Sequence, residues 1–320
     1  MFTLPTLFFK LKRSVLSLNL RGMKTEILQD FDLLPAIRAL KSGELVAFPT
    51  ETVYGLGAPV FNEEAVQKIF TVKGRPADNP LIAHIASLDE ASRLGEGFNA
   101  FFYMLAEAFW PGPLTIVVQK RACVPDLVSA GHPTIAIRMP MHRVARELII
   151  GVGEPLVAPS ANLSGKPSPT RVRDVWDDLN GKIGYIIDGG ECEVGLESTV
   201  ISLVHAQPTL LRPGKVTQEA LEEILGEKVV LPEKGAPILS PGMKYRHYAP
   251  LAKMKLVFKK EELQGPFFKP TQQSLYKELR NADRQHLEFI EIYCDEAVQK
   301  DPALMNRLLR ASGEIWIDNP

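Results

Sequence analysis

The sequence ELVAFPTETVYGLG, residues 44–57, joins a short apolar run to a polar segment that contains two glycines. The run from Glu44 to Phe48 predicts a buried strand that ends before Pro49, because proline cannot donate a strand hydrogen bond. Hydroxyl side chains and glycines at the carboxyl end of a strand let the backbone approach a ligand closely. Taken alone, a purely structural turn explains these residues as well.

Strand and helix patterns alternate on both sides of this stretch, which is typical of an α/β domain. Asp32 is predicted to cap a helix that ends at Gly43, and Asn62 to cap a second, amphipathic helix. Further strands are predicted over 81–86, 114–119, 134–139, 156–158, 184–188, 199–204 and 209–211. Further helices are predicted near 99–109, 141–150, 171–179 and 217–225.

Prolines and glycines are concentrated in residues 232–250, which predicts a proline-stiffened linker after a first domain over 23–231. Residues 251–320 then predict a small second α/β domain. Its elements are expected as a strand at 254–258, a helix at 271–280, a strand at 287–292 and a helix at 302–311. Residues 1–22 carry four basic residues and no acidic one. We interpret them as a disordered extension or the result of an upstream start, with a targeting segment as the alternative.

The 320-residue chain is 45% hydrophobic and 23% charged, with a formal net charge of −1, as in ordinary globular proteins. This balance excludes a molecule-wide basic field for nucleic acid, although a local basic patch stays open. No run of 18 apolar residues occurs, so no membrane span is expected. Cys123, Cys192 and Cys294 are far apart and lack metal-ligand spacing, so a reducing, cytoplasmic location is expected.

Several common motifs of nucleotide-binding proteins and hydrolases are missing from the sequence. There is no Walker A loop, no GxGxxG after a strand, no HExxH and no GxSxG. The basic and hydroxyl residues that stand at predicted strand ends indicate instead that phosphate is bound by dispersed side chains and loop amides.

Basic side chains occur at two such positions. Lys73 and Arg75 lie at the end of the second helix, where they either stabilise the helix dipole in solvent or form a fork for phosphate oxygens. In the strand at 134–139, alternation places Ile135 on the core face and Thr134 and Arg138 on the other face. Arg138 could bind a small anionic ligand there, or could merely pair with a neighbouring carboxylate.

Polar loops follow two further strands. Ser160 and Asn162 come directly after the strand at 156–158, in a Gly/Pro-rich loop that continues to Thr170. They suit contacts to phosphate or ribose, and local turn hydrogen bonds explain them equally well. The segments Glu197-Ser198-Thr199 and Leu211-Arg212-Pro213-Gly214 supply another hydroxyl and another guanidinium at strand ends.

Seven motifs occur in order along residues 24–250. They are FPTETVYGLG, KIFTVKGRPADNPLIAHI, TIAIRMP, APSANLSGKPSPT, GLESTV, LLRPG and SPGMKYRHYAP. Together they resemble the two-domain type of the threonylcarbamoyl-AMP synthase family, which shares the YrdC-like fold. The resemblance implies a twisted open α/β domain with a large, positively lined cavity, then a linker and a Rossmann-like second domain. Here that second domain is shorter than is usual in the family.

The resemblance also assigns roles to residues. It implies that threonine is held by Thr52, His84, Arg138, Ser198 and the backbone near Ala158. It implies that ATP is surrounded by Lys73, Arg75, Asn79, Thr134, Ser160, Asn162, Ser168, Arg212 and, from the linker, Tyr248, with Tyr245 a weaker candidate. Charge neutralisation would come from Lys73, Arg75 and Arg212, and no convincing general base is visible.

The resemblance implies L-threonine, bicarbonate and ATP with Mg²⁺ as reactants, and threonylcarbamoyl-AMP, pyrophosphate and water as products. The downstream partner would be the machinery that transfers the threonylcarbamoyl group to tRNA, and weak RNA binding would be compatible with it. Two alternatives stay open: a non-catalytic module for RNA or ribosomes, and carbamoyl transfer through a carbamoyl-adenylate without a threonine pocket.

Overall fold

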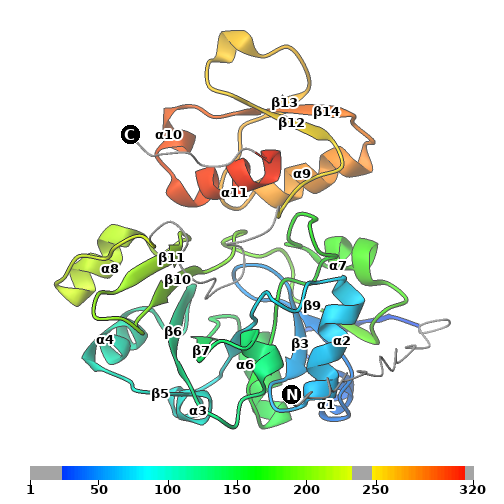
Figure 1. Ribbon diagram of the computed structural model, residues 1–320. Coiled ribbons are helices and arrows are strands. Elements are labelled where there is room, and N and C mark those ends of the chain that lie inside the picture. Colours follow the sequence, from blue (N-terminus) through cyan, green and yellow to red (C-terminus); the bar gives the residue numbers. More distant parts are fainter. Residues whose placement is uncertain (1–23, 233–246, 314–320) are drawn as a thin grey trace, which may run out of the picture.

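The computed structural model describes residues 24–232 and 247–313 (Figure 1). The basic extension 1–22 and most of the expected linker, residues 233–246 with Tyr245, lie outside the described residues. Within the described ranges the chain forms one large mixed sheet and one small parallel sheet, each accompanied by helices.

The large sheet contains 11 strands. They are β1 (Glu26–Gln29), β2 (Val46–Phe48), β3 (Gly55–Pro59), β4 (Ile82–His84), β5 (Gly95–Glu96), β6 (Leu114–Lys120), β7 (Thr134–Arg138), β8 (Leu156–Val157), β9 (Tyr185–Asp188), β10 (Thr199–Ser202) and β11 (Thr209–Arg212). Their order is β1-β9-β2-β3-β8-β4-β7-β6-β10-β11, with β5 paired to β6. Parallel pairs such as β4–β7 stand beside antiparallel pairs such as β3–β8, which confirms an α/β class with a mixed sheet.

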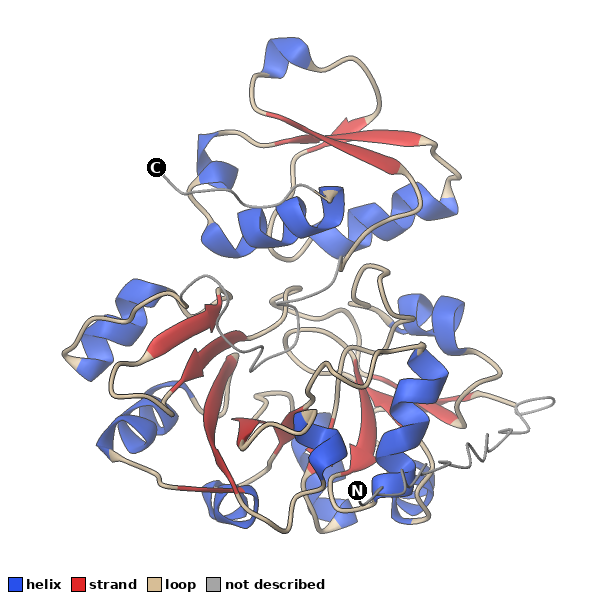
Figure 2. Ribbon diagram, viewed as in Figure 1, coloured by secondary structure: helices blue, strands red, loops and turns tan. Residues whose placement is uncertain are grey.

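Helices pack around this sheet (Figure 2). They are α1 (Leu34–Lys41), α2 (Glu63–Lys73), α3 (Leu88–Leu94), α4 (Ala100–Phe109), α5 (Asp126–Ser129), α6 (Arg143–Val152), α7 (Val172–Leu179) and α8 (Gln218–Leu225). Strand alternation separates two cores. Val46 and Phe48 of β2 pack with residues of α1 and α6, whereas Ala47 between them belongs to the core that contains the apolar face of α2.

Helix caps test two local predictions. The Asn62 side chain accepts a hydrogen bond from the Ala65 backbone N–H, so the predicted cap of α2 is confirmed. The predicted cap of α1 by Asp32 is wrong. The N-cap is Leu33, which makes no side-chain cap hydrogen bond, and a proline lies in the first turn, where its missing N–H is tolerated.

The two glycines of the opening stretch lie in a strand rather than in the turn. Gly55 and Gly57 belong to β3, which pairs antiparallel with β2. A Cβ added to Gly57 would lie 2.7 Å from the Phe48 ring, so this glycine is required by cross-strand packing. Periodicity alone did not reveal β3 because all of its residues are buried, so no alternation of exposed polar and buried apolar residues marks the strand.

The second sheet is parallel, with the order β12-β14-β13. Its strands are β12 (Lys253–Val257), β13 (Phe267–Phe268) and β14 (Phe289–Tyr293), and its helices are the 3₁₀ turn η1 (Lys260–Glu262), α9 (Leu275–Arg284), α10 (Glu296–Gln299) and α11 (Pro302–Ser312). The four predicted elements are present, and β13 and α10 were not predicted. Figure 1 shows α9 and α11 on the side of this sheet that faces the first domain. Across the described ranges, no helix has the length and apolar character that crossing a bilayer requires.

Candidate active site

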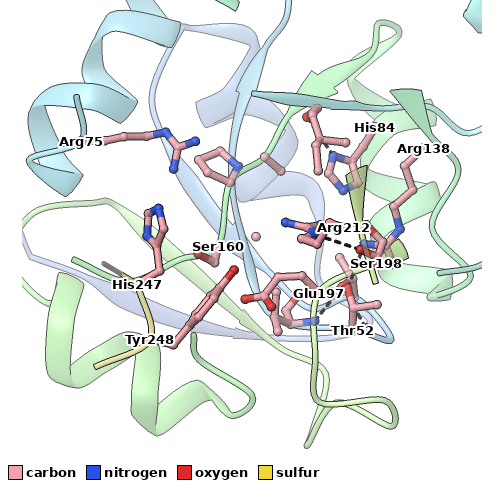
Figure 3. A pocket seen from close by; sticks show the side chains of 16 residues that line it. Thr52, Arg75, His84, Arg138, Ser160, Glu197, Ser198, Arg212, His247 and Tyr248 are labelled. Carbon is pink, nitrogen blue, oxygen red and sulfur yellow. Dashed lines mark hydrogen bonds between the residues drawn. The ribbon is translucent and has the colours of Figure 1, made fainter. Parts of the chain in front are cut away.

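A cavity of about 70 Å³ lies at the carboxyl ends of several strands of the large sheet. It is lined by Thr50, Thr52, Val53, Gly55, Arg75, Ile82, His84, Arg138, Ala158, Pro159, Ser160, Glu197, Ser198, Arg212, His247 and Tyr248. These residues come from the loops after β2 and β8, from β3, β4 and β7, from the segment after α2, from the turns beside β10 and β11, and from the start of the second described range at residues 247–248. Figure 3 shows Arg75, His247 and Tyr248 on one side and His84, Arg138 and Thr52 on the other.

Arg138 is held in place through all three of its nitrogen atoms. Its Nη2 donates to Glu51 Oε1 at 2.6 Å, its Nη1 to Thr52 Oγ1 at 2.8 Å and its Nε to the Gly112 carbonyl at 3.2 Å. Arg138 and Glu51 are both buried. Arg138 therefore pairs with a neighbouring carboxylate, as one interpretation of its sequence pattern expected, and it also lines the cavity, where binding of a small anionic ligand stays a prediction.

His84 and Ser198 lie beside Arg138 on this side of the cavity. Burial, reinforced by the charge of Arg138, lowers the pKa of His84 to about 3, so its imidazole is neutral at physiological pH. His84 Nδ1 donates to the Ile82 carbonyl at 3.2 Å, which leaves Nε2 as an acceptor. The Ser198 hydroxyl lies 2.7 Å from Thr115 Oγ1. The wall thus presents a guanidinium, hydroxyls and a neutral imidazole, a set that suits a small zwitterion.

Two more arginines supply positive charge to the same cavity. Arg75 is held by backbone carbonyls, with its Nη2 donating to Pro80 at 3.0 Å. Burial, with the charge of Arg212 acting in the same direction, lowers the pKa of Arg75 to about 10, which still leaves it charged at neutral pH. Arg212 donates from Nε to the Ser198 carbonyl at 3.0 Å and from Nη2 to the Ser198 hydroxyl at 3.2 Å. A bound anion would therefore meet two fixed cations.

Lys73 does not form a fork with Arg75. Its ammonium is buried beneath the loop after β8 and donates to the carbonyls of Ser160 and Asn162, both at 2.5 Å. Burial, followed by the charge of Arg75, holds the pKa of Lys73 well below its ordinary value. Lys73 is not among the residues that line the cavity, and it supports the loop that carries Ser160.

Four more of the predicted ATP-binding residues lie behind the cavity wall or away from it. Asn162 Nδ2 donates to the carbonyls of Leu163 and Lys166, and the Ser168 hydroxyl donates to Glu197. Asn79 has a buried side-chain oxygen without a hydrogen-bond partner among the described residues. Thr134 begins β7 and Arg138 ends it, which separates their backbones by roughly 13 Å.

The sequence patterns did not identify Glu51, Glu197 and His247 as members of the site. Glu51 lies inside the opening stretch and Glu197 inside GLESTV. An acidic residue within an otherwise apolar or small-residue segment is a usable signal, because a buried carboxylate needs a cationic partner. Both acids have such a partner here, Arg138 for Glu51 and Arg307 for Glu197.

Comparisons with known proteins show the family of this chain. The sequence family Sua5_yciO_yrdC, described as "Telomere recombination", matches residues 38–214, and "Threonylcarbamoyl-AMP synthase, C-terminal domain" matches residues 216–267. The chain is 41% identical to a threonylcarbamoyl-AMP synthase of Pyrococcus abyssi, over 90% of this chain and 96% of the relative. It is 40% identical to one of Bacillus subtilis, over 89% and 94%.

A solved structure of P. abyssi Sua5 in complex with L-threonine has the same architecture. It superposes with a TM-score of 0.83 at 39% identity, and the match covers 90% of this chain and 97% of that one. Both family matches, both relatives and the fold agree over most of the chain. The chain therefore belongs to the threonylcarbamoyl-AMP synthase family of nucleotidyl-transferring enzymes.

Proposed function

We propose that this chain converts ATP, L-threonine and bicarbonate into threonylcarbamoyl-AMP, pyrophosphate and water. The observation that carries the proposal is one cavity that is lined by Arg75 and Arg212 and also by the polar side chains of Thr52, His84 and Arg138. The first pair suits a polyphosphate, and the second group suits an amino acid with a hydroxyl side chain. The proposal agrees with the names of the relatives and with the threonine complex of P. abyssi Sua5.

In this proposal Arg138 binds the threonine carboxylate, and the hydroxyls of Thr52 and Ser198 help to orient the amino acid. The amine captures carbon dioxide derived from bicarbonate as a carbamate. A carbamate oxygen then attacks the α-phosphorus of ATP, and pyrophosphate leaves. The attacking group is already anionic and needs no general base at this step, so the protein contributes positioning and charge neutralisation.

Mg²⁺ would enter with ATP as part of the substrate. Among the described residues no group of three His, Cys, Asp or Glu side chains could hold a metal ion. Glu197 lines the cavity, but its carboxylate already accepts hydrogen bonds from Ser168, Tyr276 and Arg307. Phosphate oxygens and water are the ligands that Mg²⁺ commonly keeps in such sites.

We further propose that the end of the linker covers the nucleotide. The cavity of about 70 Å³ is smaller than the ~300 to 1,000 Å³ of typical ligand pockets. His247 and Tyr248 line the cavity on the side of Arg75 (Figure 3), and Tyr248 adopts a left-handed backbone conformation with φ 66°. Admission of ATP would require these side chains to move outward, and their return would exclude water from a reactive adenylate.

The product would be passed to machinery that transfers the threonylcarbamoyl group to tRNA. The formal net charge of −1 agrees with a small-molecule substrate for this chain, because tight binding of a nucleic acid favours a strongly basic protein. A carbamoyl transferase would release pyrophosphate without threonine. A passive RNA-binding module would release none. The favoured function differs from both because it requires an amino acid pocket.

The test is to incubate the purified chain with ATP and bicarbonate, with and without L-threonine, and to identify products by mass spectrometry. We expect threonine-dependent pyrophosphate release and a mass for threonylcarbamoyl-AMP, with L-serine giving less product. Equal pyrophosphate release without threonine would favour carbamoyl transfer. No release, together with salt-sensitive RNA binding, would favour the RNA module.

A further inference from the structure

A second-domain arginine contacts the wall of the cavity from behind. Arg307 of α11 is 0% exposed, and its Nε donates to Glu197 Oε2 at 3.0 Å. Its Nη1 donates to the Pro213 carbonyl at 2.9 Å, next to Arg212 in the chain. Its guanidinium carbon also lies 5.7 Å from the ring centre of Tyr248. Arg307 thus contacts three segments that surround the cavity, although its own side chain does not line the cavity.

Tyr276 of α9 contacts two of the same segments. Its hydroxyl donates to Glu197 Oε2 at 2.8 Å, and its ring centre lies 5.3 Å from that of Tyr248. Tyr276 is fully buried, as is Arg307. Figure 1 shows that α9 and α11 are the helices of the second domain that face the first. These contacts give the second domain a direct connection to the cavity.

The negative charge of Glu197 gives these contacts an effect on the binding of phosphate in the cavity. Burial alone would raise the pKa of Glu197, but the charges of Arg307 and Arg212 and the hydrogen bonds from Ser168 and Tyr276 lower it. Glu197 is therefore ionised and faces the space in which ATP is proposed to bind. A carboxylate there repels phosphate, and if it lost Arg307 it would draw on Arg212 for compensation.

We propose that Arg307 and Tyr276 are positioning residues for ATP: they hold and neutralise the Glu197 carboxylate at the cavity wall, and they support Tyr248 over the nucleotide. This inference rests on the proposed function and deepens it. The second domain is thereby a part of the active site.

Other contacts between the domains allow the role of Arg307 to be isolated. On α9, Arg280 pairs with Asp178 at 2.8 Å and Arg284 with Asp174 at 3.0 Å. These pairs lie away from Glu197 and anchor the second domain independently of Arg307. Loss of Arg307 alone therefore changes the cavity wall while the domains stay docked. Arg284→Met is the matched control, because it removes an interdomain arginine that does not contact the cavity wall.

The experiment measures ATP affinity with a fluorescent ATP analogue, together with KM for ATP and for threonine, in the full chain. Arg307→Met is expected to weaken nucleotide binding and to raise KM for ATP at least tenfold, with a change in KM for threonine of less than threefold. Arg284→Met is expected to change neither KM by more than about twofold. Glu197→Gln combined with Arg307→Met is expected to recover most of the lost ATP affinity, because the uncompensated carboxylate is gone.

Unchanged ATP affinity in Arg307→Met, or a double variant no better than the single one, would overturn the inference. If Arg307→Met does not fold, Arg307→Lys replaces it. Lysine keeps the charge but loses the fork, so an intermediate ATP affinity is expected and wild-type affinity contradicts the inference. Analogue binding does not depend on turnover. A chain that binds ATP but makes no threonine-dependent product would refute the proposed function while leaving the Arg307 test intact.

Discussion

The guanidinium of Arg138 and the carboxylate of Glu51 form a buried ion pair, with 2.6 Å between Nη2 and Oε1 and side chains 5% and 4% exposed. The second carboxylate oxygen of Glu51, Oε2, has no hydrogen-bond partner among the described residues. Arg138 therefore compensates a buried acid and faces the cavity at the same time. One substitution therefore cannot separate its structural role from the proposed binding of the threonine carboxylate.

Replacement of Arg138 by alanine is expected to lower the free energy of unfolding by about 3 to 5 kcal/mol, because Glu51 would stay buried without a cation. Adding Glu51→Gln should recover more than half of this loss, while threonine-dependent pyrophosphate release stays abolished in both variants. Urea denaturation and product assays check both statements. A single variant that loses less than about 1 kcal/mol would contradict the buried-pair argument.

Lys73 provides a second prediction, because its ammonium supports the Ser160 loop from below. Lys73→Met should remove its two hydrogen bonds to the Ser160 and Asn162 carbonyls, each worth about 0.5 to 1.5 kcal/mol, and should raise KM for ATP by roughly tenfold as the loop shifts. Lys68→Met on the same helix is the control, since Lys68 binds Glu44 and the Gly43 carbonyl instead. Equal effects in the two variants would argue against a specific role for Lys73.

Tyr248 provides a third prediction through its ring. Aromatic stacking on a base contributes about 1 to 3 kcal/mol, so Tyr248→Ala should raise KM for ATP by roughly 5- to 150-fold. Tyr248→Phe keeps the ring, so its KM for ATP should be at least fivefold lower than the KM of Tyr248→Ala. Steady-state kinetics with varied ATP separate the two variants. Identical losses would assign the effect to the hydroxyl, which both variants lack, instead of the ring.

The depressed pKa of His84 predicts a dependence of stability on pH. Its pKa is about 3 in the folded protein and about 6.5 when unfolded, so below pH 6.5 the unfolded state binds the extra proton. Stability is therefore complete above pH 6.5 and is lost as the pH falls towards 3, by roughly 2 kcal/mol between pH 7 and pH 5.

His84→Gln should lose correspondingly less stability than the wild type over that interval. Denaturant titrations at the two pH values measure the difference. Parallel losses in wild type and variant would show that His84 titrates normally and is not a buried neutral imidazole.

Local patterns predicted much of the fold. The alternation of strands and helices, the Asn62 cap and the two faces of β7 each follow from residues a few positions apart, where steric and hydrogen-bonding preferences act directly. The sequence patterns did not predict β3. Its Gly55 and Gly57 are required by packing against Phe48 and Ala158, and contacts with such neighbours leave no periodic pattern in the sequence. The motifs also grouped Arg75, Arg138, Ser160 and Arg212 as one site, and the structure brings these four into one cavity.

The sequence by itself determined the α/β class and the chemical character of the site: cations, hydroxyls and an imidazole at strand ends. Only the tertiary structure decided which acid each cation meets. Arg138 meets Glu51 across 87 positions of the chain, and Arg307 meets Glu197 across 110. Buried charges are stable only when long-range packing supplies a partner, and packing between distant segments leaves no periodic trace in the order of residues.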